Sequence, residues 1–219
     1  MKKLLITIGL LITLIGCEYE EFDPTAPRES TAVKWTDGIV YYKFDASFPV
    51  SGKVSVRNCM DIYEKVSSLR FIELENTKGI KYFCTIKKGN VNQSSGMGMH
   101  KNMEVILEKY NNYEIILHEL GHLIGLEHEH QREDRNNYIT INWGNIIEGK
   151  EHNFSIVKHQ LIPTTLFKYD ERSIMHYPMY AWSNNGEMTI TSNIFFIVGT
   201  LTYRFTDEDI KKIQYLHPL

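Results

Sequence analysis

The sequence lacks the features that mark several classes of protein. It has no run of basic residues and a formal net charge of −3, so the positive surface of a nucleic-acid-binding protein is missing. The apolar run at residues 4–15 is too short to span a bilayer comfortably. The chain has only three cysteines, and no internal repeat stands out. We therefore expect neither a nucleic-acid partner nor a spanning helix.

The N-terminus has the pattern of a secretory signal. Two lysines follow Met1, and residues 4–15 have the length of a signal-peptide core. The segment ending in Gly16-Cys17 resembles a bacterial lipobox, in which the cysteine is lipidated and becomes the first mature residue. We expect a lipoprotein signal peptide at 1–16 and a membrane anchor at Cys17. An ordinary signal peptide that contains a cysteine is the alternative.

Residues 17–30 indicate an acidic tether or a short pro-segment. Four acidic residues at positions 18–23 are followed by Pro24 and Pro27, and such a segment can bury little apolar surface. An acidic stretch after a lipidated cysteine also resembles the signal that sends some bacterial lipoproteins to the cell surface. We expect a lipid-anchored protein of the bacterial cell envelope, at the outer membrane or cell surface.

From Trp35 onward the composition is that of a globular domain, long enough for one sizeable core or two small lobes. β-Branched and aromatic residues predict a strand at 39–44, and apolar residues at helical spacing predict a helix within 56–66. Alternating apolar residues predict strands at 80–86 and 103–107.

The stretch from His118 to His128 has the pattern of a metal site. His118 and His122 lie one turn apart on a helix, so both imidazoles can reach one metal ion, and Glu119 projects beside it as a general base. Gly125 permits the helix to end there. His128 can then return as a third ligand, which leaves the fourth position open as in catalytic zinc sites.

The shorter His-Glu-x-x-His pattern occurs by chance in helices, but the full eleven-residue pattern is far more specific. It resembles the metzincins, and within them the residues that follow resemble the astacin family: Glu129, Arg132, Asp134, Arg135 and Tyr138. Downstream, Ser173–Tyr177 is similar to the astacin Met-turn. The resemblance covers roughly residues 30–219.

The resemblance implies an α+β fold, a two-lobe metzincin catalytic domain at 31–219. Its N-terminal lobe would be a twisted mixed sheet with two helices, and its loop-rich C-terminal lobe would end in a helix. Thr206 and Asp209 form a candidate capping box for that helix, which we expect to be structural. The strand at 103–107 would be the edge of the cleft, where an extended substrate adds as a further strand.

The resemblance also implies the site. One catalytic Zn²⁺ would be held by His118, His122 and His128, with Glu119 as general base. Tyr177 would be a switchable fifth ligand that turns to the oxyanion, and Met175 would lie under the metal.

Glu129 has a further role in activated family members, where the matching residue contacts the ammonium of a new N-terminus. That terminus would fall near Ala26, and trimming there would release the enzyme from its anchor. No Phe-x-Gly-Asp pro-segment motif precedes it. Either the protein needs no latency or another group blocks the metal.

Both disulfides common in animal members are absent, because the matching positions hold no cysteine. Cys59 and Cys84 fall on apolar faces of predicted elements. A buried disulfide of their own or two free thiols are both compatible with this pattern.

We expect a secreted, monomeric zinc endopeptidase that binds protein or peptide substrates in extended form. The first alternative is a catalytically silent surface lipoprotein that uses the metzincin scaffold for binding. An enzyme of another zinc family is disfavoured by the Met-turn.

Overall fold

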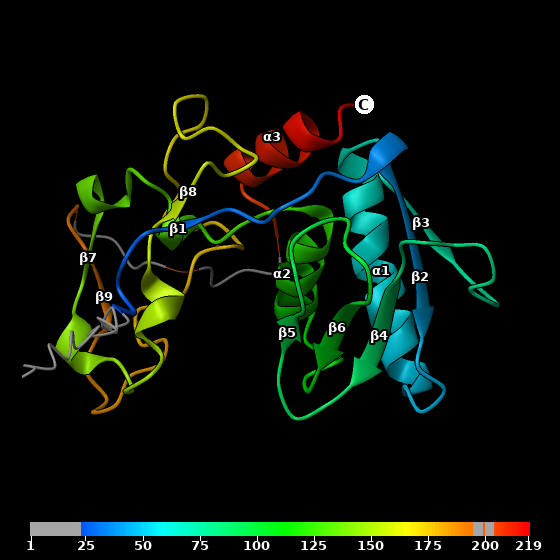
Figure 1. The fold of residues 1–219 in the computed structure, drawn as a ribbon, viewed down its shortest axis with the longest axis horizontal. Coiled ribbons are helices and arrows are strands. Elements are labelled where there is room, and N and C mark those ends of the chain that lie inside the picture. The colour runs from blue at the N-terminus through cyan, green and yellow to red at the C-terminus, as the bar shows by residue number, and fades with distance from the viewer. Residues whose placement is uncertain (1–22, 195–198, 200–203) are drawn as a thin grey trace, which may run out of the picture.

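A computed structural model describes residues 23–194, 199 and 204–219 of the chain. The expected signal peptide at 1–16 and the anchor site Cys17 lie outside these residues. The described part forms a sheet-containing N-terminal lobe and a C-terminal lobe of loops and short strands, with helix α2 between them (Figure 1). None of the described helices has the length and apolar character needed to cross a membrane.

The N-terminal lobe contains a five-stranded mixed sheet in the order β3-β2-β4-β6-β5. Four strands are parallel and β5 is antiparallel. Strands predicted at 39–44 and 103–107 are confirmed with these bounds. The sheet comprises β2 (Ile39–Phe44), β3 (Arg70–Glu73), β4 (Cys84–Lys88), β5 (Gln93–Ser94) and β6 (Met103–Leu107).

The strand predicted at 80–86 is displaced. Strand β4 begins at Cys84, and the chain bends at Lys81 and Tyr82 before it. Alternation of apolar residues continues through this bend because Tyr82 still packs on the core from outside the sheet. The alternation of apolar side chains therefore begins earlier in the chain than the strand whose backbone is hydrogen-bonded.

The prediction that 103–107 forms the cleft edge is wrong. Strand β6 pairs with β4 on one side and with β5 on the other, so β5 is the edge strand. The reason is that the chain after β4 turns back and lays Gln93–Ser94 antiparallel against Val105–Ile106.

Two helices pack against the sheet and each other, α1 (Val50–Val66) and α2 (Tyr113–Ile124) (Figure 1). Their apolar faces and the inward residues of the strands form one core. Cys59 on α1 and Cys84 on β4 are buried in this core as free thiols. Burial raises the pKa of each to about 12.

The C-terminal lobe holds a second, smaller core that includes Ile139, Phe154 and Ile190. This lobe also holds two short sheets. In one, β7 (Ile139–Ile141) pairs antiparallel with β9 (Ile190–Ser192). In the other, β1 (Arg28–Glu29) pairs parallel with β8 (Val157–Lys158). Ordered backbone at β1 therefore lies within the segment expected to be a tether. Turns of 3-10 helix occur at Thr36–Gly38, Glu129–Gln131, Arg135–Asn137, Trp143–Asn145 and Glu151–Phe154.

The predicted C-terminal helix is α3 (Asp207–Leu216), and it begins with the predicted capping box. The Thr206 hydroxyl accepts from the Asp209 amide, and the Asp209 carboxylate accepts from the Thr206 amide. Helix α3 packs back onto α1. It also reaches the junction of the lobes, where the candidate site lies.

Candidate metal centre and active-site cleft

Helix α2 places two histidines, His118 and His122, on the face that looks toward the C-terminal lobe. The helix begins at Tyr113, where the Asn112 side chain accepts a hydrogen bond from the Ile115 amide. It ends at Gly125, whose φ of 106° belongs to the left-handed region that favours glycine. The chain then turns, and His128 comes back to the other two histidines.

The Nε2 atoms of the three histidines converge. Those of His118 and His128 are 3.2 Å apart, and those of His122 and His128 are 3.1 Å apart. All three ligand atoms lie within 4.8 Å of one another. Nitrogens at about 2.0–2.1 Å from a tetrahedral zinc ion lie about 3.4 Å apart, so the group fits zinc.

Each imidazole is oriented by an oxygen atom at its other nitrogen. Nδ1 of His118 lies 2.8 Å from the Ile174 carbonyl. Nδ1 of His122 lies 2.8 Å from the Leu126 carbonyl, and Nδ1 of His128 lies 3.1 Å from the side-chain oxygen of Gln131. With Nδ1 donating to oxygen, each Nε2 presents its lone pair to the common point. Sequence reasoning did not find Gln131, whose role depends on a turn after His128.

Burial lowers the pKa of all three histidines, that of His122 to about 3. The rings therefore stay neutral at ordinary pH, which is the form that binds metal. The donor set, its spacing and its charge state all fit a single zinc ion.

Glu119 lies beside this group and is 6% exposed. Its Oε2 atom has no hydrogen-bond partner among the described residues. Burial raises the pKa of Glu119 to about 8, and a hydrogen bond from the Ser94 backbone on β5 opposes this rise. A divalent cation at the histidines would also oppose it. One oxygen of this carboxylate is thus free to act on a molecule in the cleft.

Tyr177 lies against His128, with ring centroids 4.5 Å apart in an edge-on contact. Its ring stacks on His130 at 4.1 Å. Burial raises the pKa of Tyr177, and a hydrogen bond with the Trp182 side chain opposes the rise. Sequence reasoning missed Trp182, because nothing in the local pattern separates it from other surface aromatics.

Met175 of the predicted Met-turn is buried, being 2% exposed, and it packs against helix α2, which carries His118 and His122. Its sulfur packs against Gly121 on α2, where a Cβ atom would lie only 2.5 Å away. Its carbonyl accepts from the Glu129 amide at 3.0 Å. The Met-turn and the chain after His128 are therefore joined directly.

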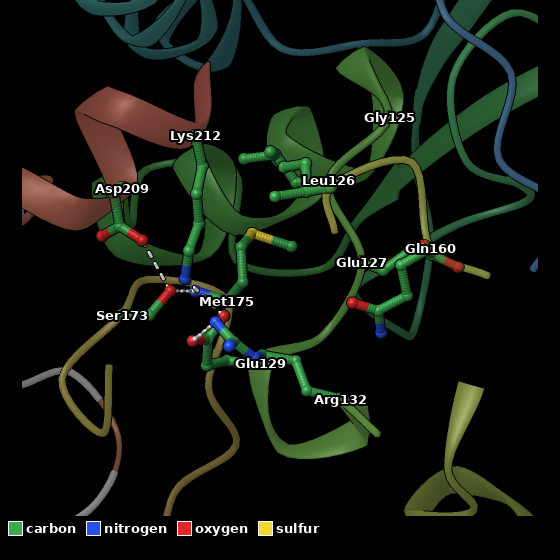
Figure 2. Close-up of a pocket in the computed structure, with 11 residues that line it drawn as sticks. Gly125, Leu126, Glu127, Glu129, Arg132, Gln160, Ser173, Met175, Asp209 and Lys212 are labelled. Carbon is green, nitrogen blue, oxygen red and sulfur yellow. Dashed lines mark hydrogen bonds and ion pairs between the residues drawn. The ribbon is translucent and has the colours of Figure 1, made fainter. Parts of the chain in front are cut away.

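Glu129 is buried and its carboxylate is fully used (Figure 2). One oxygen accepts from the Arg132 guanidinium (3.0 Å) and the Asp170 amide (2.9 Å), and the other from the Lys212 ammonium (2.6 Å). The resemblance implies an N-terminal ammonium as a partner of Glu129 after trimming. In this structure the carboxylate pairs with two cationic side chains, Lys212 of α3 and Arg132. The residues that line this pocket all lie at or beyond Gly125 among those described.

The histidines, Glu119 and Tyr177 open into a cleft of about 690 Å³ between the lobes. Residues 91–97, which include edge strand β5, form one wall. Two basic side chains, Arg28 and Lys150, also line it. The Lys150 ammonium lies 4.9 Å from the centre of the Trp182 ring. The cleft can thus receive an extended chain along the sheet edge.

Comparison with known proteins identifies relatives of this arrangement. Residues 28–217 match the peptidase family described as Astacin. The chain is 33% identical over 180 residues to the dorsal-ventral patterning protein tolloid of Drosophila melanogaster, covering 80% of this chain. It is 33% identical over 186 residues to zinc metalloproteinase nas-6 of Caenorhabditis elegans, covering 84% of this chain. The matches span only 16% of tolloid and 53% of nas-6.

Solved structures agree on the fold. High choriolytic enzyme 1, a hatching enzyme zinc-protease of the medaka fish Oryzias latipes, superposes with a TM-score of 0.73 at 26% identity. The match covers 84% of this chain and 92% of that one. Myroilysin superposes with a TM-score of 0.59 at 19% identity, covering 85% of this chain and 96% of that one.

Proposed function

This chain belongs to the astacin family, whose members are zinc metalloendopeptidases, and we propose that it hydrolyses internal peptide bonds of protein substrates. The observation that carries the proposal is the convergence of three neutral imidazoles next to a carboxylate oxygen without a partner among the described residues. A closed structural zinc site would have a fourth protein ligand in place of an open cleft.

We assign the metal-binding role to His118, His122 and His128. A zinc ion held there supplies Lewis acidity, which lowers the pKa of water and polarises a peptide carbonyl. Glu119 takes the proton of the attacking water on its free oxygen and later delivers it to the leaving amine. Burial raises the pKa of Tyr177, so its hydroxyl stays protonated. This hydroxyl donates a hydrogen bond to the oxyanion.

The substrate binds in extended form along β5. An edge strand offers main-chain groups to a further strand, and β5 has a neighbour on one side only among the described strands. Its residue Ser94 also contacts Glu119 through the backbone, so a chain added to this edge passes the general base.

The cell-envelope location is part of the same proposal. It rests on the lipobox-like segment that ends at Cys17 and on the acidic residues after it. Acyl chains on one cysteine hold a protein at a membrane surface without a spanning helix.

Digestion of an unfolded protein by the zinc-loaded full chain tests the activity. Mass spectrometry should find internal cuts that vanish with a chelator and return when zinc is added. The His122→Ala variant should lose both the metal and the cuts. Absence of cleavage by a chain that holds one zinc ion would instead favour the silent binding scaffold.

A further inference from the structure

Helix α3 carries two charged residues on its buried face. Asp209 is 1% exposed and Lys212 is 5% exposed, and both lie on the same face as the core residues Ile213 and Leu216. Burying an ionised side chain is costly unless it is paired and hydrogen-bonded. Each of the two therefore needs a partner inside the molecule.

Lys212 is the counter-ion of Glu129. Its ammonium lies 2.6 Å from one oxygen of that carboxylate (Figure 2). Arg132, the other cation at Glu129, is held chiefly by Asp134 through two hydrogen bonds of 2.8 and 2.9 Å. Among the described residues, Lys212 therefore forms an ion pair with no carboxylate other than Glu129, whereas Arg132 is shared between Glu129 and Asp134.

Asp209 holds the Met-turn. Its carboxylate accepts from the Ser173 hydroxyl (2.5 Å) and the Ile174 amide (3.1 Å). The carbonyl of the same Ile174 contacts Nδ1 of His118 at 2.8 Å. A line of hydrogen bonds therefore runs from α3 to one of the histidines.

The second line of contacts reaches His128. Glu129, fixed by Lys212, follows His128 in the chain, and its amide is bonded to the Met175 carbonyl. The pocket around this ion pair is lined by α3, the Met-turn and the segment after α2. Among the described residues, the two cations in this pocket are Lys212 of α3 and Arg132 of the segment after α2.

We propose that Lys212 is a positioning residue: through Glu129 it locks His128 in place, while Asp209 on the same helix fixes His118 through Ile174. In this arrangement α3 supports the zinc site from outside the ligand set, and Lys212 supplies a buried ammonium to Glu129. The proposal rests on the proposed function only in taking these histidines as metal ligands. Removing a group that is hydrogen-bonded to a metal-ligating histidine changes metal affinity by about tenfold to a hundredfold, and Lys212 acts one residue further from the ligand.

The test measures zinc affinity by competition with a chelator for the full chain and three variants. Lys212→Met should weaken zinc binding by about tenfold, the lower end of that range, and alter the visible spectrum of the cobalt-substituted protein. Lys212→Arg should retain most of the affinity. The matched control is Lys211→Met, because Lys211 is exposed on the adjacent position of α3 and pairs only locally with Glu208.

A double variant separates positioning from simple stability. In Lys212→Met two carboxylates, Glu129 and Asp134, share the single cation Arg132. Lys212→Met/Glu129→Gln removes this excess buried negative charge, so the resistance to unfolding should recover relative to Lys212→Met. Zinc affinity should stay low, because α3 no longer holds the chain after His128. Recovery of zinc affinity together with stability would overturn the proposal, as would unchanged affinity in Lys212→Met.

If Lys212→Met does not fold, the test rests on Lys212→Met/Glu129→Gln, which lacks both the contact between α3 and residue 129 and the excess buried charge. Unchanged zinc affinity in that variant would overturn the proposal. The readout is independent of catalysis. A wild-type chain that binds zinc but cleaves nothing would contradict the proposed function and still leave the affinity comparison decisive.

Discussion

Gly121 packs so closely against the sulfur of Met175 that a Cβ atom at this position would lie 2.5 Å from it. The same atom would lie 3.1 Å from the Tyr63 hydroxyl, which is itself bonded to the Leu117 carbonyl. The middle of the zinc helix therefore needs a residue without a side chain, so that the Met-turn can pack beneath it.

We predict that Gly121→Ala destabilises the fold. Alanine favours a helix by about 1 kcal/mol over glycine, but an extra methyl in a packed core costs about 1–3 kcal/mol. Urea unfolding should show a net loss of stability and a weaker zinc site. Gly144→Ala is the control, because no heavy atom lies within 4 Å of its Cβ position. Equal stability of the two variants would contradict the packing argument.

His217 gives the chain a dependence on pH. It is buried after α3, with Nε2 3.2 Å from the Ile124 carbonyl. Burial lowers its pKa below the ordinary 6.5, and Lys34 adds to this. The unfolded chain then binds more protons below about pH 6.5, so stability is present above that pH and is lost as the pH falls.

The matching variant is His217→Gln, which keeps a donor for Ile124 without the titrating ring. The free energy of unfolding is measured in urea, with a chelator present, at about pH 7.5 and about pH 5.5. It should fall more between these two pH values in the wild type than in this variant. Parallel losses in the two proteins would show that His217 does not contribute.

Cys59 and Cys84 should be unreactive in the folded protein. Both are fully buried, and a pKa of about 12 leaves almost no thiolate. Iodoacetamide labelling followed by peptide mass spectrometry should modify them only in denaturant. Rapid labelling under native conditions, or a disulfide between them, would contradict this placement.

If Cys17 is lipidated, replacing it should change how the protein distributes between a detergent phase and an aqueous phase. In bacterial cells, the full chain should enter the detergent phase of a Triton X-114 extract, and Cys17→Ser should move it to the aqueous phase, because the acyl chains are lost. The same phase for both proteins would show that Cys17 does not carry the anchor.

Much of the fold follows from local sequence pattern. The strand at 103–107, the helix that carries His118 and the capping box at Thr206 were predictable because each depends on residues within one element. The spacing from His122 through Gly125 to His128 also predicted the cluster, since a helix and one turn place all three side chains.

Features that depend on contacts between residues far apart in the sequence were not predictable. Strand β5 is only Gln93–Ser94, too short for any periodicity, and its pairing with β6 is what moves the cleft edge. One feature of the sequence pointed to Lys212. This charged residue falls on the apolar face of the predicted C-terminal helix, one position before Ile213. Its partner Glu129 lies far away in the chain, so only the folded structure joins them.

The most direct test of the proposed mechanism is the rate of peptide-bond cleavage by the zinc-loaded full chain beside Glu119→Gln, with bound zinc measured in both. We predict one zinc ion in each protein and a loss of activity of about a thousandfold in the variant, because only the proton acceptor has been removed. Substantial turnover by Glu119→Gln with zinc retained would contradict the role of Glu119 and the mechanism built on it.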